Sequence, residues 1–85
     1  MKEMDCVELT SEKERYIKQG VHKGMQGWIC LDNCTEGYWL VNFPQYGEKP
    51  DIATISVHRD DMIVIQKMDA FVNERIKAEH EEKSI

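Results

Sequence analysis

The stretch VHKGMQGWICLDNCTEGYWLVNF, residues 21–43, decides the fold that we expect for this chain. Within it, residues 25–31 and 38–43 place an apolar residue or glycine at every second position, which is the period of a half-buried β-strand. The intervening DNCTEG is rich in Asp, Asn and Gly, residues that favour turns. We therefore predict a β-hairpin. Its inward-facing residues are expected to be Met25, Gly27, Ile29, Leu31, Trp39, Val41 and Phe43.

Three further short strands are predicted outside the hairpin. They are CVELT at 6–10, IATISV at 52–57 and MIVIQ at 62–66, all rich in the β-branched and apolar residues that suit a pleated surface. Residues 11–24 are mostly polar and end in glycine, so we expect a long loop that holds one helical turn before Gly20. PQYGEKPD and HRDD are typical of a loop and a tight turn.

From residue 67 the period changes from that of a strand to that of a helix. Met68, Phe71, Val72 and Ile76 lie at helical spacing among charged residues, which predicts an amphipathic C-terminal helix. A chain of 85 residues is long enough for one domain with a small core. The expected fold is mainly β: a small five-stranded SH3-like barrel at 1–66, with a C-terminal helix at 67–85 that packs on the barrel or extends from it.

The charge distribution favours a basic protein partner over nucleic acid. The formal net charge is −5. Residues 28–65 include six acidic and two basic residues, which gives this segment a net charge of −4. Such a surface repels phosphate backbones. The sequence has no apolar run of the length that a membrane span needs, and its first ten residues lack the apolar core of a signal peptide. We expect a cytoplasmic protein with no membrane contact.

The side chains that could support catalysis or metal binding do not form a recognisable pattern. Cys6, Cys30 and Cys34 are an odd number of cysteines, which favours reduced thiols over a disulfide framework. The C-x₃-C pair lacks the second paired set that a structural zinc site usually has. Asp60 and Asp61 are expected in a solvated turn. We expect no enzymatic activity, no metal and no cofactor, and the role of the three cysteines stays open.

A resemblance supports the predicted fold. VHKGMQGWI, a turn and GYWLVNF together resemble the glycine-marked hairpin of SH3-like barrels, and they are distantly similar to the KOW module of ribosomal and transcription proteins. The chain is more similar to small bacterial domain-of-unknown-function proteins, in which such a hairpin precedes an Asp-containing strand and a short turn, as in DIATISVHRDDMIVI. The resemblance covers residues 7–65 and implies that Gly27 takes the place of the glycine at which a KOW hairpin bends. Gly24 and Gly37 are expected in turns.

Strict alternation places several apolar side chains on the outside of the barrel, among them Trp28 and Cys30. Two alternatives stay open for what covers this outer face. One is the protein's own helix, docked through Met68, Phe71, Val72 and Ile76; the other is a partner that binds aromatic side chains surrounded by acidic residues. The candidate partner-binding residues are Trp28, Tyr38, Leu40, Tyr46, Asp32, Glu36, Asp60 and Asp61.

The sequence thus favours a non-enzymatic protein-binding module of a bacterial cytosol. An immunity or antitoxin-type protein that neutralises a basic partner is the particular form that we expect, since opposite charge speeds capture. The alternative, implied by the resemblance, is a KOW-like accessory module that binds ribosome, RNA polymerase or RNA. The oligomeric state stays open.

Overall fold

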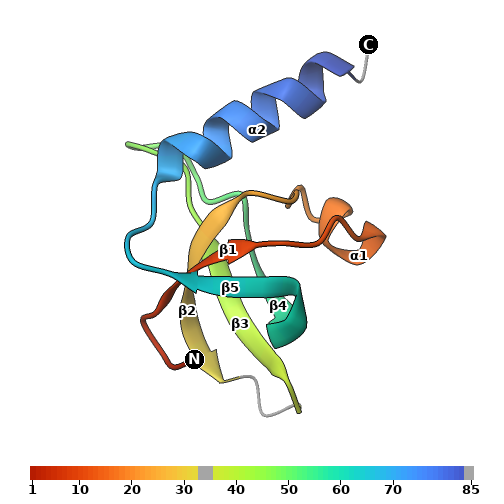
Figure 1. Ribbon diagram of the computed structural model, residues 1–85. Coiled ribbons are helices and arrows are strands. Elements are labelled where there is room, and N and C mark those ends of the chain that lie inside the picture. Colours follow the sequence, from red (N-terminus) through yellow and green to blue (C-terminus); the bar gives the residue numbers. More distant parts are fainter. Residues whose placement is uncertain (33–35, 84–85) are drawn as a thin grey trace.

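The computed structural model describes residues 1–32 and 36–83 (Figure 1). The described residues form a mainly β protein with a C-terminal helix, as the sequence predicts. The elements in chain order are β1 (Cys6–Leu9), α1 (Glu14–Ile17), β2 (Gln26–Asp32), β3 (Tyr38–Phe43), β4 (Ala53–His58), the 3₁₀ turn η1 (Arg59–Asp61), β5 (Met62–Ile65) and α2 (Ala70–Lys83). The predicted helical turn before Gly20 is α1.

The five strands form one antiparallel sheet in the order β4-β3-β2-β1-β5. The first strand of the chain therefore lies in the interior of the sheet, between β2 and β5, and β4 and β5 are joined through η1. Figure 1 shows the sheet curving around its core, with α2 lying across one end of it. This arrangement is consistent with the small SH3-like barrel expected from the sequence.

The core follows the predicted alternation along most strands. Val7 and Leu9 of β1, Val41 and Phe43 of β3, and Val57 of β4 are all fully buried. Two of the remaining core side chains, Tyr16 and Val21, come from the segment that the sequence indicates to be a polar loop. That segment folds back because its few apolar residues cover the open side of the sheet, where they are removed from water.

The hairpin of β2 and β3 contains an irregularity that alternation does not predict. Ile29 pairs with Val41, but the next pair is Leu31 with Leu40, so Cys30 is an extra residue in β2. A bulge of this kind reverses the side on which the following side chain points. Leu31 is therefore 46% exposed, and its predicted place in the core is wrong.

Gly27 is required by the close approach of β3. A Cβ atom at this position would lie 2.2 Å from the backbone oxygen of Asn42, closer than any side chain tolerates. Gly27 does not have a positive φ, so the spacing between the strands, and not an unusual backbone angle, makes glycine necessary here. Gly24, in the turn before β2, does have a positive φ, of +93°.

The C-terminal helix docks through a buried amide. The side-chain Oδ1 of Asn73 accepts a hydrogen bond from the backbone N–H of Gln26 at 2.6 Å, while its Nδ2 donates to the backbone oxygens of Gln26 and Pro44 at 2.6 and 2.8 Å. Asn73 is fully buried, and Ile76, 8% exposed, packs near Gly24. α2 is thus fixed to the end of the sheet where β2 begins and β3 ends.

This position bears on one of the two covers that the sequence leaves open, the protein's own helix. Tyr38 is at the other end of β3 from Pro44, so α2 does not lie over Tyr38. Of the four predicted docking residues, Ile76 is buried and Val72 packs on the core, but Phe71 is 57% exposed. None of the helices in the described part of the chain is long and apolar enough to cross a membrane.

Candidate protein-binding surfaces

Two exposed aromatic rings lie side by side near the start of α2. Tyr46, from the loop between β3 and β4, stacks on Phe71, from the first turn of α2, with ring centroids 4.1 Å apart and an interplanar angle of 22°. Each residue is 57% exposed. Two large aromatic side chains that lie together in water offer an apolar surface whose burial by a partner would be favourable.

Contacts on both sides of the ring pair hold it in place. The backbone N–H of Phe71 donates to Oδ1 of Asp69 at 2.9 Å, and the N–H of Asp69 donates to Oε1 of Gln26 at 2.8 Å, which fixes the start of α2 to β2. An ion pair between Lys49 and Glu74 joins the loop of Tyr46 to the helix. These contacts fix the start of α2 and join it to the loop that carries Tyr46, so the two rings are held next to each other.

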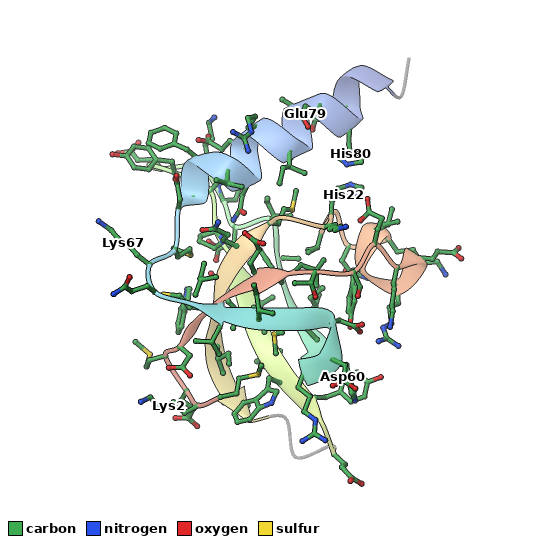
Figure 2. The ribbon with its side chains drawn as sticks, viewed as in Figure 1. Lys2, His22, Asp60, Lys67, Glu79 and His80 are labelled. Atoms are coloured by element: carbon green, nitrogen blue, oxygen red, sulfur yellow. The ribbon has the colours of Figure 1, made fainter. Side chains whose placement is uncertain are left out.

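A groove of about 520 Å³ lies beside the ring pair. Its walls are formed by Tyr46, Lys67, Met68, Asp69, Ala70 and Phe71. The groove is mostly apolar, with one charged residue of each sign at its edge, and Figure 2 shows Lys67 pointing outward from the segment between β5 and α2. We call these six residues the aromatic groove. It has the size and composition to take up an apolar side chain of a partner.

A buried carboxylate, that of Asp61, lies in the turn between β4 and β5, away from the aromatic groove. Asp61 is 3% exposed; its oxygens accept hydrogen bonds or ion pairs from Lys13 Nζ and Arg15 Nη2 at 2.7 Å each, and from the Tyr16 hydroxyl at 2.6 Å. Burial alone would raise the pKa of Asp61, but the hydrogen bonds from Lys13, Tyr16 and Arg15 lower it well below its usual range. The predicted solvated turn is therefore wrong for Asp61.

The Asp61 cluster connects the segment between β1 and β2 to η1. The Tyr16 hydroxyl also accepts the backbone N–H of His58 at 3.1 Å, and the N–H of Thr10 donates to the backbone oxygen of Asp61 at 2.7 Å. Burial, and then the hydrogen bond to the Asp61 carboxylate, raises the pKa of Tyr16, so the hydroxyl stays protonated. The arrangement is that of a structural connection, and Asp61 is not available to a partner.

Tyr38 and Asp60 border this cluster on its solvent side. The Tyr38 ring meets His58 edge to face at 5.0 Å, and the guanidinium of Arg15 lies 5.7 Å from its centre. Asp60 is exposed and points into solvent in Figure 2, while His58 Nδ1 accepts its backbone N–H at 3.1 Å. Gly37, also predicted in a turn, has φ +80°, and a Cβ there would lie 2.6 Å from His58 Nε2.

Trp28 occupies the middle of the sheet's outer face, where it belongs to a polar network. Its indole Nε1 donates to Oδ1 of Asn42 at 3.1 Å, and Asn42 Nδ2 donates to Asp51 at 3.0 Å and to Thr54 at 2.9 Å. A half-buried Trp28 with a satisfied N–H is a structural element of this face. Leu40 is half-buried opposite Leu31.

The eight predicted site residues are thus distributed over several surfaces. Tyr46 is in the aromatic groove; Asp60 and Asp61 are in η1, and Tyr38 of β3 contacts His58 just before it; Trp28 and Leu40 are on the outer face. Glu36 is exposed, and the side chain of Asp32 lies outside the described part of the structure.

The described cysteines, Cys6 and Cys30, have free thiols, whereas Cys34 lies outside the described residues. Burial raises the pKa of the Cys30 thiol, and the nearby Asp51 charge acts in the same direction. The protonated thiol that this favours is a poor nucleophile.

Sequence reasoning missed Phe71 as a surface residue, because its helical spacing assigns it to the buried stripe. The signal that could have placed it is Asp69, a typical helix-capping residue two positions earlier. A helix that begins there has Phe71 in its first turn, beside the loop that carries Tyr46.

Comparisons with models of protein families, with curated proteins and with solved structures found no match. The functional argument therefore depends on the geometry of these surfaces.

Proposed function

We propose that this chain is a non-enzymatic protein-binding module that holds its partner at the aromatic groove. The observation that carries the proposal is the stacked pair of Tyr46 and Phe71, each 57% exposed and located beside a groove. Aromatic side chains of this kind dominate the binding energy of protein interfaces, particularly where a partner side chain fills a neighbouring pocket.

The charges near the groove favour a basic partner. Glu48 and Asp51 are exposed in the same loop as Tyr46, and Asp69 is exposed at the groove itself. Of the nearby cations, Lys49 is paired with Glu74, which leaves Lys67 as the counter-charge in the groove wall. Acidic residues around an apolar centre increase the rate of association with a positively charged surface.

Within this class, an immunity or antitoxin-type protein is the form that we favour. Such a protein covers the basic cleft of a nuclease-type toxin, and it needs an acidic surface, apolar anchors and no catalytic group of its own. The net charge of −5 and the aromatic groove meet the first two needs. The buried Asp61 does not contribute to that surface, since Lys13 and Arg15 neutralise it.

The alternative of a KOW-like module that binds RNA has less support. Lys49 and Lys77 each lie in an ion pair with a carboxylate, and Lys13 and Arg15 share the carboxylate of Asp61, so part of the basic charge is already compensated within the chain. Binding to a phosphate backbone depends on cations that are free to replace condensed counterions.

Co-purification from a lysate of the source organism tests the proposal, with nuclease added to remove nucleic acid. The groove variant is Tyr46→Ser with Phe71→Ser, and the matched control is Ile63→Ser with Val64→Ser, because those side chains are 51% and 50% exposed on β5. Both variants are first shown to be folded by circular dichroism. We expect a basic protein to be retained by the unaltered chain and by the control, and to be lost from the groove variant.

Two results would contradict the proposal. Equal loss from the groove variant and the control would mean that the groove has no special part in binding. Material that is retained only when nuclease is left out of the lysate would favour the nucleic-acid alternative.

A further inference from the structure

Three side chains from separate parts of the chain meet where α2 passes over the loop before β2. Glu12 follows β1, His22 precedes β2, and His80 lies on α2. One ligand atom of each lies within 4.8 Å of the other two. Figure 2 shows His22 and His80 facing each other in the gap beneath α2.

The distances within this group are short. Oε2 of Glu12 lies 3.2 Å from Nδ1 of His22 and 3.9 Å from Nε2 of His80, and Oε1 accepts the backbone N–H of Lys23 at 2.9 Å. The two imidazole rings are stacked, with centroids 3.5 Å apart and planes within 6° of parallel. The His22 side chain is 13% exposed, and the other two are 38% exposed, so the group is half-buried but open to solvent.

We propose that Glu12, His22 and His80 bind a divalent metal ion of the zinc class. Two imidazole nitrogens and one carboxylate oxygen form a donor set that zinc uses in proteins, with bonds of about 2.0–2.2 Å. Ligand atoms around a tetrahedral ion are roughly 3.4 Å apart by the same geometry. Two of the three separations, 3.2 and 3.9 Å, are already close to this value. The imidazole rings turn out of their stacked arrangement so that each nitrogen lone pair points at the ion.

The geometry around Glu12 supports the same assignment. The backbone N–H of Lys23 donates to Oε1 of Glu12 at 2.9 Å, which leaves Oε2 directed at His22 and His80. Lys77 of α2, which lines the same opening as His22 and His80, is paired with Glu81 at 2.7 Å, which reduces its repulsion of a bound cation.

The ion would remain accessible from outside. His22 and His80 both line an opening of about 420 Å³, together with Gly20, Asp51 and Lys77 among others. Three protein ligands leave the fourth position of a tetrahedral ion for water or for an exchangeable ligand from this opening. Because His80 is on α2 and the other two ligands are not, the ion also joins the helix to the rest of the fold.

The test is a titration of the full chain with Zn²⁺ in competition with a chromophoric chelator. It is done in a Cys6→Ser, Cys30→Ser, Cys34→Ser background, because thiolates are also zinc ligands. We expect one bound Zn²⁺ per chain and a raised Tm, as binding to the folded state alone requires. His22→Gln and His80→Gln each weaken binding at least ten-fold, while the control His58→Gln leaves it unchanged.

The proposal is overturned if the background variant binds no Zn²⁺, or if His22→Gln with His80→Gln together binds as tightly as that background. Should the background variant fail to fold, NMR of the unaltered chain decides the question: Zn²⁺ must shift the imidazole resonances of His22 and His80, and an unchanged spectrum refutes the site. These results are independent of partner binding at the aromatic groove, so the two proposals can fail separately.

Discussion

Replacement of Asp61 by alanine tests whether the cluster between α1 and η1 stabilises the fold. Asp61 has 4% of its side chain exposed, whereas Lys13 and Arg15, which pair with it, are 46% and 47% exposed. Its third donor is the buried hydroxyl of Tyr16, at 2.6 Å. After Asp61→Ala, water can therefore hydrogen-bond to Lys13 and Arg15, but it cannot reach the Tyr16 hydroxyl.

The magnitude follows from that difference. Water solvates Lys13 and Arg15 once the carboxylate is gone, so each half-exposed pair contributes ~0.5 kcal/mol. The Tyr16 hydroxyl loses its acceptor in a buried place, which costs ~1–3 kcal/mol. The sum predicts that Asp61→Ala lowers the free energy of unfolding by about 2–4 kcal/mol, a large share of the roughly 4–13 kcal/mol usual for a domain of this length.

The assay is urea unfolding followed by tryptophan fluorescence, with Asp60→Ala as the control. Asp60 is the adjacent acid in the same turn, but its side chain is 79% exposed, so its loss should cost less than ~0.5 kcal/mol. The two variants remove the same charge from neighbouring positions. A difference between them therefore reports on burial and hydrogen bonding.

The pH dependence gives a second readout with a definite sign. Because the folded state lowers the pKa of Asp61 below its unfolded value, the carboxylate stabilises the fold above the unfolded pKa of about 4. That stability is lost as the pH falls further, toward the folded pKa. The gap between the unaltered chain and Asp61→Ala should be full at pH 7 and should narrow below pH ~4. Equal losses for the two alanine variants, or a gap that does not narrow in acid, would refute this explanation.

Two other substitutions test individual contacts. Gly37→Ala should lower the free energy of unfolding by about 2–3 kcal/mol, because φ is +80° and the new Cβ lies 2.6 Å from His58 Nε2. The control is Gly47→Ala, where φ is +75° but no atom lies within 4 Å of the new Cβ, and it should lower the free energy of unfolding by only ~1 kcal/mol. Thermal unfolding measures both. Similar costs would show that contact with His58 is unimportant. Asn73→Ala should cost about 2–4 kcal/mol by leaving buried backbone groups unpaired and should speed amide exchange at Gln26. Unchanged exchange there would mean that the amide does not hold α2.

The strands were predictable because their signal is local. A strand that is buried on one face of a sheet has an apolar residue at every second position. This pattern is present in β1, with Val7 and Leu9, and in β3, with Val41 and Phe43. Leu31 was assigned to the wrong face because the bulge at Cys30 shifts the alternation of inward and outward side chains by one residue. No residue type in the sequence signals this bulge.

The misplaced residues of the candidate site have non-local causes. Asp61 resembles any turn carboxylate in the sequence, and its principal donors lie more than 40 residues earlier in the chain. The helix docks through Val72 and Ile76, as the spacing predicts, but also through Asn73, a polar residue that no apolar pattern selects, whereas Phe71 stays exposed. Tyr46, a candidate binding residue from the sequence, is exposed, but Phe71, which stacks on it, was assigned to the buried stripe of the helix.

The central claim is that the aromatic groove is the surface that a basic protein contacts. The most direct measurement is photocrosslinking in the source organism, with the photoreactive p-benzoylphenylalanine in place of Phe71 and, as the control, in place of Ile63 on β5. Both positions are more than half exposed, at 57% and 51%, so the probe has similar access to solvent at each. The account predicts a discrete crosslink from position 71 to a basic protein and none from position 63. A crosslink from position 63 with none from position 71 would contradict it.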